Sequence, residues 1–152
     1  MGTDGVRGLC MKEVIQIFKQ LQDASGKKDK ESIIRKNQDN ELFKQCLVFL
    51  LDDNITTGIA KKSLAKDIRC NGYTILYDWT ELMQYLQENN TGRDIDILTV
   101  QSFLMTQDED DKWFYEGMVT KSLKLGCDKK TVNKVIPNLI SHWDVQLGSI
   151  VG

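Results

Sequence analysis

Apolar residues recur along this chain at the spacing of an amphipathic α-helix. Between residues 11 and 23 they stand at i, i+1, i+4 and i+7, which places them on one stripe of a helix. Runs in which apolar and polar residues alternate, as in a half-buried strand, are scarce. The pattern predicts an all-α fold, a single compact domain of seven or eight helices. The expected helices cover about residues 11–23, 25 or 28 to 36, 40–50, 60–68, 74–88, 93–105, 108–125 and 128 to 135 or 136.

Residues suited to helix ends support these boundaries. Asp39 or Asn40 can cap the third helix and Asp128 the last one, because short side chains with an oxygen atom accept hydrogen bonds from free N–H groups. Gly126 can end the helix before the last, and Pro137 prevents the last one from continuing.

The composition is that of one ordinary globular domain. The chain has 152 residues, 41% hydrophobic and 28% charged, and a single proline and no Ser/Gly-rich run leave no internal linker. No apolar stretch approaches the ~20 residues of a membrane span, and we expect a cytoplasmic protein. Residues 1–10 are expected to be a leader, appended or accidental, residues 11–147 the helical domain, and residues 148–152 the start of a linker.

Basic residues are concentrated in three stretches, although the net charge is only −2. Residues 27–36, 61–69 and 121–134 together hold 14 of the 20 basic residues and four of the 22 acidic ones. Charge segregated in this way can present a basic face to a polyanion. Ordinary solvated helix surfaces are the alternative interpretation of the same pattern.

Patterns for catalysis or metal binding are weak. The only histidine, His142, has no nucleophile and orienting acid specified beside it, as a catalytic triad needs. The four cysteines show neither C-x-x-C spacing nor a nearby histidine, so we expect neither a zinc site nor a disulfide framework. The acidic run at 108–111 falls at an expected helix start, where solvation and the helix dipole explain it better than a metal ion does.

The opening segment, GTDGVRG, contains part of a nucleotidyl-transfer motif. Enzymes that carry AMP or GMP on a lysine have the sequence Lys-x-Asp-Gly-x-Arg, in which the lysine amine attacks the α-phosphate. Gly2 stands at the lysine position, so the attacking amine is missing. The same string is similar to the opening of bacterial phosphosugar mutases and is therefore not diagnostic. We expect no catalytic activity from this chain alone.

Two other stretches share a design suited to a phosphate group. TTGIAKKSLAK and LGCDKKTVNK each place a glycine-containing turn before a short helix that begins with paired lysines. Free N–H groups at a helix start, the positive end of the helix dipole and the lysines can together hold a phosphate. Glycine would let a duplex backbone approach the main chain closely. The hypothesis is a surface that grips nucleic acid without reading its sequence.

Three separated blocks of the sequence are similar to one known family. KSLKLGCDKKTVNKVIPNLI matches its pattern dLxxGxxxxtxNKvxpxLi, SIIRKNQDNELFKQCL matches ailekNkDNelLkrvl, and ITTGIAKKSL is similar to the loop between them. Together the blocks resemble the N-terminal DNA-binding domain of bacteriophage-type ATP-dependent DNA ligases. They stand in family order, and the likeness covers about residues 12–147, although residues 74–112 agree mainly in hydrophobic pattern. The matching residues are Asn37, Asp39, Asn40, Glu41, Leu42, Leu123, Gly126, Thr131, Asn133, Lys134, Val135, Pro137, Leu139 and Ile140.

The resemblance implies an all-helical, monomeric module that grips nicked duplex DNA through the minor groove and the sugar-phosphate backbone. In this family a nucleotidyltransferase domain, which uses ATP and Mg²⁺, and an OB-fold domain follow, so no cofactor is expected in this chain. The full-length protein would be an ATP-dependent DNA ligase of replication and repair, in the bacterial host cytoplasm if it is phage-encoded. The likeness carries DNA-backbone contacts over to Gly58, Lys61, Lys62, Gly126, Thr131, Asn133 and Lys134. Charge and helix position alone add Lys66, Lys129 and Lys130.

Two alternatives remain open at this point. Asn133 can instead be a buried residue that ties two helices together. The chain as a whole can be a free-standing adaptor whose helical surface binds another protein, with basic stretches that serve solubility. The DNA hypothesis also requires both lysine-bearing stretches to face a common side of the molecule.

Overall fold

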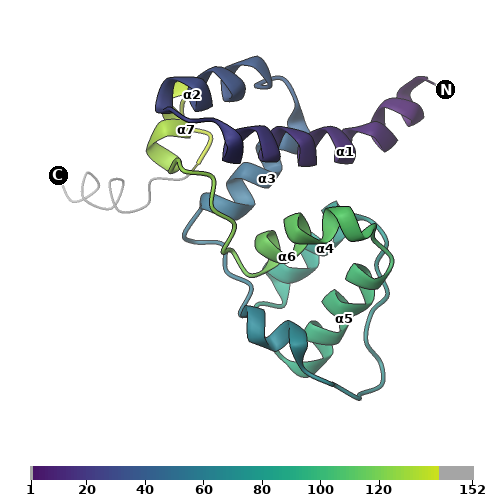
Figure 1. Cartoon of the computed structure of the whole chain (residues 1–152). Helices are drawn as coiled ribbons and strands as arrows, with labels where there is room; N and C mark the ends of the chain where they lie inside the picture. Colours follow the sequence, from purple (N-terminus) through teal and green to yellow (C-terminus); the bar gives the residue numbers. More distant parts are fainter. Residues whose placement is uncertain (1, 141–152) are drawn as a thin grey trace. The chain divides into compact units, whose positions relative to one another are not determined.

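The computed structural model describes the backbone of residues 2–140 and the side chains of residues 11–140. Within this part of the chain it contains seven α-helices, two short 3-10 helices and no strand (Figure 1), which confirms the all-α prediction. The contacts divide the chain into two compact units: one combines the residues up to Asp52 with those from Lys124 onward, and the other is Asp53–Leu123. No described helix is both long enough and apolar enough to cross a bilayer.

The first unit is organised around the long helix α1, Gly2–Asp23. Helices α2, Lys27–Lys36, and α3, Glu41–Leu51, pack against α1, and α7, Lys129–Val135, packs against α2 (Figure 1). The expected start of the first helix near residue 11 is wrong, because the helix continues back to Gly2 through a segment without proline. That residues 1–10 are an appended leader stays a prediction.

Apolar stripes of these helices form the core of the first unit. The rings of Phe18 in α1 and Phe43 in α3 meet edge to face, with centroids 5.7 Å apart. The cap predicted for α3 is confirmed at Asn40, whose side chain accepts a hydrogen bond from the N–H of Phe43 at 3.1 Å. The side chains with no exposed surface are Val14, Phe18, Leu21, Ile34, Phe43, Cys46, Leu47, Val132 and Ile140.

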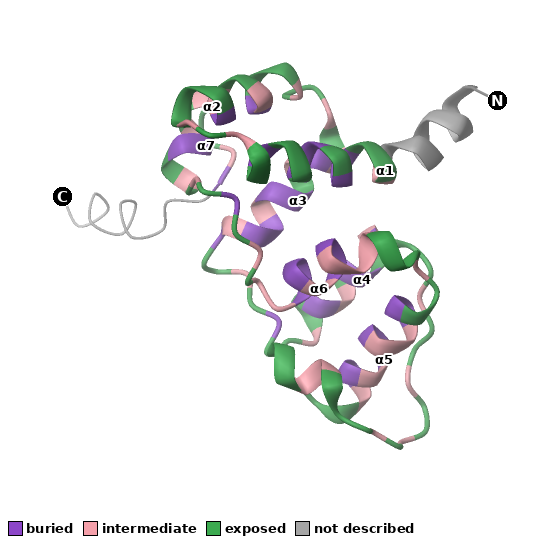
Figure 2. Ribbon diagram, in the orientation of Figure 1, coloured by how far each residue is buried: buried purple, intermediate pink, exposed green. Residues whose placement is uncertain are grey.

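The second unit contains three α-helices and both 3-10 helices. Helices α4, Trp79–Glu88, and α6, Lys112–Val119, accompany α5, Asp94–Met105, which packs against α6 and against the 3-10 helix η1, Lys61–Ala65. The second 3-10 helix, η2, Glu109–Asp111, leads directly into α6. In Figure 2 buried positions alternate with exposed or intermediate ones along α4 and with mostly intermediate ones along α5 and α6, as expected of helices with one face in a core.

Four aromatic rings fill the centre of the second unit. The ring of Trp79 lies 5.2 Å from that of Tyr115, 6.0 Å from that of Phe103 and 6.2 Å from that of Phe114, measured between centroids. Phe103 and Tyr115 also meet edge to face at 5.1 Å. All four side chains are buried, so this cluster dominates the apolar area that the unit removes from water.

Helix α4 begins five residues later than the hydrophobic pattern predicts. The side chain of Asp78 accepts a hydrogen bond from the N–H of Thr80 and caps the helix there. Before the cap, the N–H of Thr74 donates to the hydroxyl of Thr99 at 3.2 Å, which holds the chain against α5 in a non-helical conformation. Ile75 and Tyr77 consequently remain 52% and 72% exposed.

The helix expected over residues 108–125 is divided and ends early. It consists of η2 followed by α6, and it ends at Val119. Lys121 adopts a left-handed conformation with φ of 54°, and the N–H groups of Ser122 and Leu123 turn back to the carbonyl oxygen of Gly117. This left-handed residue ends α6 although the hydrophobic stripe continues beyond it.

A buried carboxylate joins α4 to α5 in the second unit. Asp96 is fully buried and accepts two hydrogen bonds from the guanidinium of Arg93, at 2.9 and 3.0 Å, and one from the hydroxyl of Tyr85, at 2.7 Å. Burial acts to raise the pKa of Asp96, but the hydrogen bonds from Arg93 and Tyr85 outweigh it and hold the pKa below the ordinary value of 3.8.

We predict that this cluster makes the second unit sensitive to acid. Because the folded pKa of Asp96 lies below 3.8, its stabilising contribution is complete above that pH and is lost as the pH falls through the folded value. Urea unfolding at two pH values, one on each side of 3.8, measures the loss. Asp96→Asn should lose less stability on acidification than the wild-type protein, and Asp94→Asn, at an exposed position, should behave like the wild type. Equal losses in all three proteins would contradict the prediction.

Candidate nucleic-acid interface

The first lysine-bearing stretch lies in the second unit, and Lys61, Lys62 and Lys66 are all exposed. The α-helix expected over residues 60–68 is wrong, because the chain forms only η1, a five-residue 3-10 helix. So short a helix contributes little dipole, and the positive character here comes mainly from the lysines. The side-chain amide of Gln101 donates to the carbonyl oxygens of Leu64 at 3.1 Å and Lys66 at 2.8 Å, which fixes this backbone against α5.

The loop before η1 is anchored within the same unit. The hydroxyl of Thr57, a residue only 3% exposed, donates to the carbonyl oxygen of Val119 at 2.6 Å. The amine of Lys121 donates to the carbonyl oxygen of Ile55. These contacts hold the loop that leads into Lys61 and Lys62, so the two lysines extend from a fixed backbone.

Gly58 is required by packing inside the protein. It has φ of +72°, and a Cβ there would clash with the carbonyl group of Asn90 and lie 2.8 Å from the nitrogen of Gly92. Gly92 has φ of +70°, and a Cβ on Gly92 would likewise clash with the carbonyl group of Gly58. Packing inside the protein is by itself a sufficient reason for glycine here, because residues 90–92 occupy the space that the missing side chain leaves. A contact between DNA and its exposed main chain stays a prediction.

The second lysine-bearing stretch lies in the first unit and begins with the expected cap. The carboxylate of Asp128 accepts hydrogen bonds from the N–H of Thr131 at 3.1 Å and from its hydroxyl at 3.2 Å. The main-chain hydrogen bond from Thr131 holds the pKa of Asp128 below its ordinary value. Thr131 is 4% exposed and its hydroxyl serves the cap, so its side chain stabilises the start of α7.

The lysines of this stretch have unequal exposure. Lys130 and Lys134 are exposed, whereas Lys129 is half-buried. The amine of Lys134 lies 3.4 Å from the carboxylate of Glu31 in α2, and its side chain remains 68% exposed. The Glu31 side chain is only 12% exposed, but the Lys134 side chain is largely in solvent and can therefore also reach a second anion.

The side chain of Asn133 forms hydrogen bonds within the protein, as the structural alternative predicts. Its amide nitrogen donates to the carbonyl oxygen of Ile140 at 3.0 Å, and its amide oxygen accepts from the N–H of Ile140 at 2.9 Å. This pair of hydrogen bonds ties α7 to the segment that follows it. The structure therefore favours the alternative in which Asn133 supports the fold.

We predict that Asn133→Ala destabilises the first unit without removing a DNA contact. Loss of both hydrogen bonds to Ile140 should lower the free energy of unfolding by about 1–3 kcal/mol, measured by urea titration. DNA affinity, measured where the variant is still folded, should change less than about threefold, well below the effect of losing a charged hydrogen bond. A folded variant with a large loss of affinity would return Asn133 to the DNA-contacting set.

The sequence analysis did not predict that Lys30 is buried. It is 7% exposed, and its amine donates to the carbonyl oxygens of Leu21 at 2.6 Å and Ala24 at 2.9 Å, at the C-terminal end of α1. Gly126, with φ of +75°, lies beside it: a Cβ on Gly126 would be 2.9 Å from Cε and 3.0 Å from Nζ of Lys30. One signal was available, since Lys30 stands four residues before the buried Ile34 and therefore on the same face of α2.

The structure groups the predicted residues into two sets. Gly58, Lys61, Lys62 and Lys66 belong to the second unit, and the residues from Gly126 to Lys134 belong to the first. Each set is held together locally by the contacts above. That both sets face one duplex stays a prediction.

Other expected chemistry is weak in the described residues or lies outside them. No group of three His, Cys, Asp or Glu side chains within residues 11–140 is placed to hold a metal ion. In the acidic run, Glu109 pairs with the amine of Lys112 at 2.7 Å. His142 lies outside the described residues.

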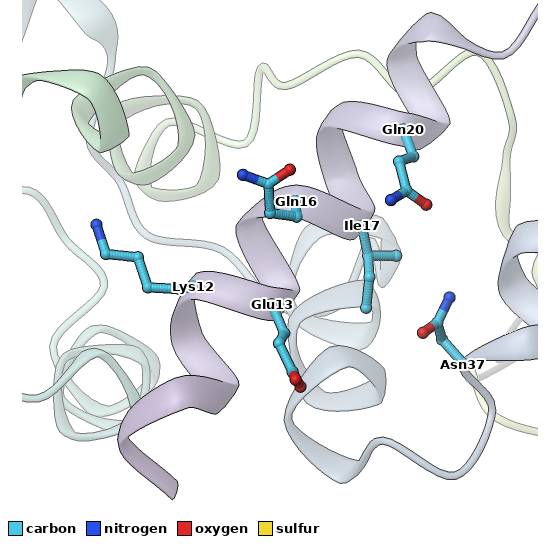
Figure 3. A pocket seen from close by; sticks show the side chains of 6 residues that line it. All are labelled: Lys12, Glu13, Gln16, Ile17, Gln20 and Asn37. Atoms are coloured by element: carbon cyan, nitrogen blue, oxygen red, sulfur yellow. The ribbon is translucent and has the colours of Figure 1, made fainter. Parts of the chain in front are cut away.

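A hollow of about 400 Å³ beside α1 is lined mostly by polar side chains (Figure 3). The amide of Asn37 donates to the carbonyl oxygen of Ile33 at 2.8 Å. The lining contains one lysine and one carboxylate and no Ser, Thr or Cys side chain. The lining residues are Lys12, Glu13, Gln16, Ile17, Gln20 and Asn37.

Comparison with known proteins gives a likeness of fold. Neither a protein-family model nor a curated protein matches the sequence. Two solved structures are similar, Pmar-Lig_Pre, with 24% identity and a TM-score of 0.56, and Pmar-Lig_PreS3, with 22% identity and a TM-score of 0.55. The likeness shows that this chain shares a helical fold with these two structures. Each match covers 80% of this chain and 29% of the other, so the chain spans about three-tenths of the length of the structures that it matches.

Proposed function

We propose that this chain is the DNA-binding domain of an ATP-dependent DNA ligase of the bacteriophage type. The observation that carries the proposal is the likeness of fold to ligase-related structures over 80% of the chain. Independent support comes from the three sequence blocks, which occur in the order of that family. By itself the chain binds nicked duplex DNA and does not seal it.

Binding operates mainly through charge. Exposed lysines of both stretches neutralise phosphate groups and release counterions, which favours binding to any sequence and weakens it as salt rises. One stretch of the DNA backbone is bound by the exposed lysines Lys61, Lys62 and Lys66, and another stretch is bound by Lys130 and Lys134. The exposed main chain at Gly58 and Gly126 lies close to the sugar-phosphate backbone, and Lys129 contributes from a half-buried position.

Catalysis belongs to other domains of the full-length protein. The nucleotidyl lysine, ATP and Mg²⁺ would be held by a nucleotidyltransferase domain, and this chain supplies affinity and placement on the nick. The protein acts as a monomer in the cytoplasm, on DNA under replication or repair.

A mobility-shift titration with a nicked duplex tests the proposal. At low salt the chain should retard the duplex, and binding should weaken steeply when salt is raised from about 50 to 200 mM, because log K falls linearly with log salt. An intact duplex of the same sequence is the control for preference for the nick. Failure to retard the nicked duplex even at low salt would refute the proposal.

One observation favours the alternative function, a helical adaptor that binds another protein. Ile75, Tyr77 and Met105 are 52%, 72% and 80% exposed, and large exposed apolar side chains are common at protein interfaces. The same titration separates the two functions, since an adaptor has no reason to bind DNA with a steep dependence on salt.

We also predict that the chain does not become adenylylated. Gly2 stands where the lysine nucleophile would be, and glycine has no group that can attack an α-phosphate. Incubation with labelled ATP and Mg²⁺ should leave no label on the protein after denaturing electrophoresis. A label on any residue would contradict the proposal that nucleotidyl transfer belongs to another domain.

A further inference from the structure

The amine of Lys30 is a buried charge with an incomplete set of partners. An ammonium group has three N–H donors, and two of them are taken by the carbonyl oxygens of Leu21 and Ala24. Among the described side chains, none forms an ion pair with Lys30 or accepts its third hydrogen. The end of a helix carries the equivalent of roughly half a negative charge, so the two carbonyl groups offset only part of the ammonium charge.

The titratable neighbours of Lys30 do not supply the missing charge. Burial raises the pKa of the Cys127 thiol, which outweighs the opposite effect of Lys30, so the thiol is neutral at pH 7. The carboxylate of Asp128 caps α7 and forms no ion pair with Lys30. A buried cation without a full counter-charge is costly, and an anion that reached it would lower that cost.

Gly126 lies at the surface directly beside the buried amine. The residue is exposed, and a Cβ on it would lie only 3.0 Å from Nζ of Lys30. Any side chain at this position would therefore cover the amine. Glycine at this exposed position therefore leaves the space next to the ammonium group free of a side chain.

We propose that Lys30 binds a phosphate group, to which its ammonium donates its third N–H past the bare main chain of Gly126. The group is a phosphate of the DNA backbone, so this assignment of the source rests on the proposed function. Lys30 thereby adds a buried, preorganised contact to the exposed lysines. A preorganised donor loses less side-chain entropy on binding than a flexible surface lysine.

Inorganic phosphate tests the site without DNA. Replacing chloride by phosphate at equal ionic strength should raise the thermal midpoint of the wild-type chain, because a ligand that binds only the folded state stabilises it. Lys30→Met keeps most of the aliphatic stem but removes the charge, and its midpoint should not respond to phosphate. Lys28→Met removes the same charge from an exposed position of α2 and should respond like the wild type.

The dependence of DNA binding on salt is the second readout. If Lys30 contacts one phosphate, Lys30→Met should reduce the slope of log K against log salt by about 0.9 and the affinity by about tenfold, whereas Lys28→Met should leave the slope unchanged. A purely structural lysine would alter stability but not this slope. A folded Lys30→Met protein with the wild-type slope and phosphate response would overturn the inference.

A second variant covers the case in which Lys30→Met does not fold. Gly126→Ala keeps the ammonium, but its methyl group displaces Cε and Nζ of Lys30 and strains the turn at φ of +75°, so the folded variant should show the same reduction in slope. An unchanged slope in the folded Gly126→Ala protein would overturn the inference. Wild-type binding to DNA without any response to phosphate would overturn the site and leave the proposed function intact. A Lys30-dependent phosphate response without DNA binding would support the site and refute the proposed function.

Discussion

Lys61→Glu combined with Lys62→Glu is expected to lower the affinity for nicked duplex DNA about a hundredfold at ~0.1 M salt. Both side chains are exposed and extend from a backbone held by Gln101 and Thr57, so the substitutions change charge with little effect on packing. Each lysine loses an attractive contact, and each glutamate adds repulsion from the phosphates. Mobility shift at two salt concentrations measures the loss and the accompanying fall in salt dependence.

The matched control for charge is Lys27→Glu with Lys28→Glu. These residues are exposed in another basic stretch, and the substitutions change the net charge of the chain by the same amount. If a local contact matters, the control should weaken binding far less than the Lys61 and Lys62 variant. Equal losses would mean that only total charge governs binding, and the assignment of residues 61 and 62 would then be wrong.

Trp79→Ala is expected to lower the free energy of unfolding by about 3–5 kcal/mol, the largest stability effect that we predict. The side chain is 2% exposed and contacts three other aromatic rings, so its removal leaves a cavity that its neighbours fill only in part. A loss of this size is a large share of the 5–15 kcal/mol that stabilises an ordinary domain. Urea unfolding followed by far-UV circular dichroism is the measurement.

Tyr77→Ala provides the internal comparison, because Tyr77 stands two residues before Trp79 and is 72% exposed. Its removal should change the free energy of unfolding by less than about 0.5 kcal/mol. Similar losses for the two variants would show that the cluster around Trp79 is not the core of its unit.

Local chemistry made several features predictable from the sequence. Asp128 caps α7 and Asn40 caps α3 as expected, because capping depends on one side chain and the N–H groups two or three residues later. The apolar stripe of α1, with Phe18 and Leu21, is buried as its spacing indicates. The exposed lysines of the candidate interface were likewise expected at exposed positions.

Features that depend on residues far apart in the sequence could not be predicted in this way. Gly58 was interpreted as a point of approach for DNA, but its partner is the chain around Gly92, 34 positions later. Lys30 was counted among surface charges, whereas the end of α1 and Gly126 enclose it. The left-handed conformation of Lys121 ends α6 although the apolar pattern runs on.

By itself, the sequence determined that this chain is helical, where most of its helices lie and that the lysines of the two candidate stretches are largely exposed. Hydrophobic periodicity and capping act between residues three or four positions apart, so both can be recognised in the amino-acid sequence. Only the tertiary structure decided that the contacts form two units, that Asn133 serves the fold and that Lys30 is a buried cation. Each of these depends on which distant segments pack together, and packing is set by shape and by the satisfaction of buried polar groups across the whole chain.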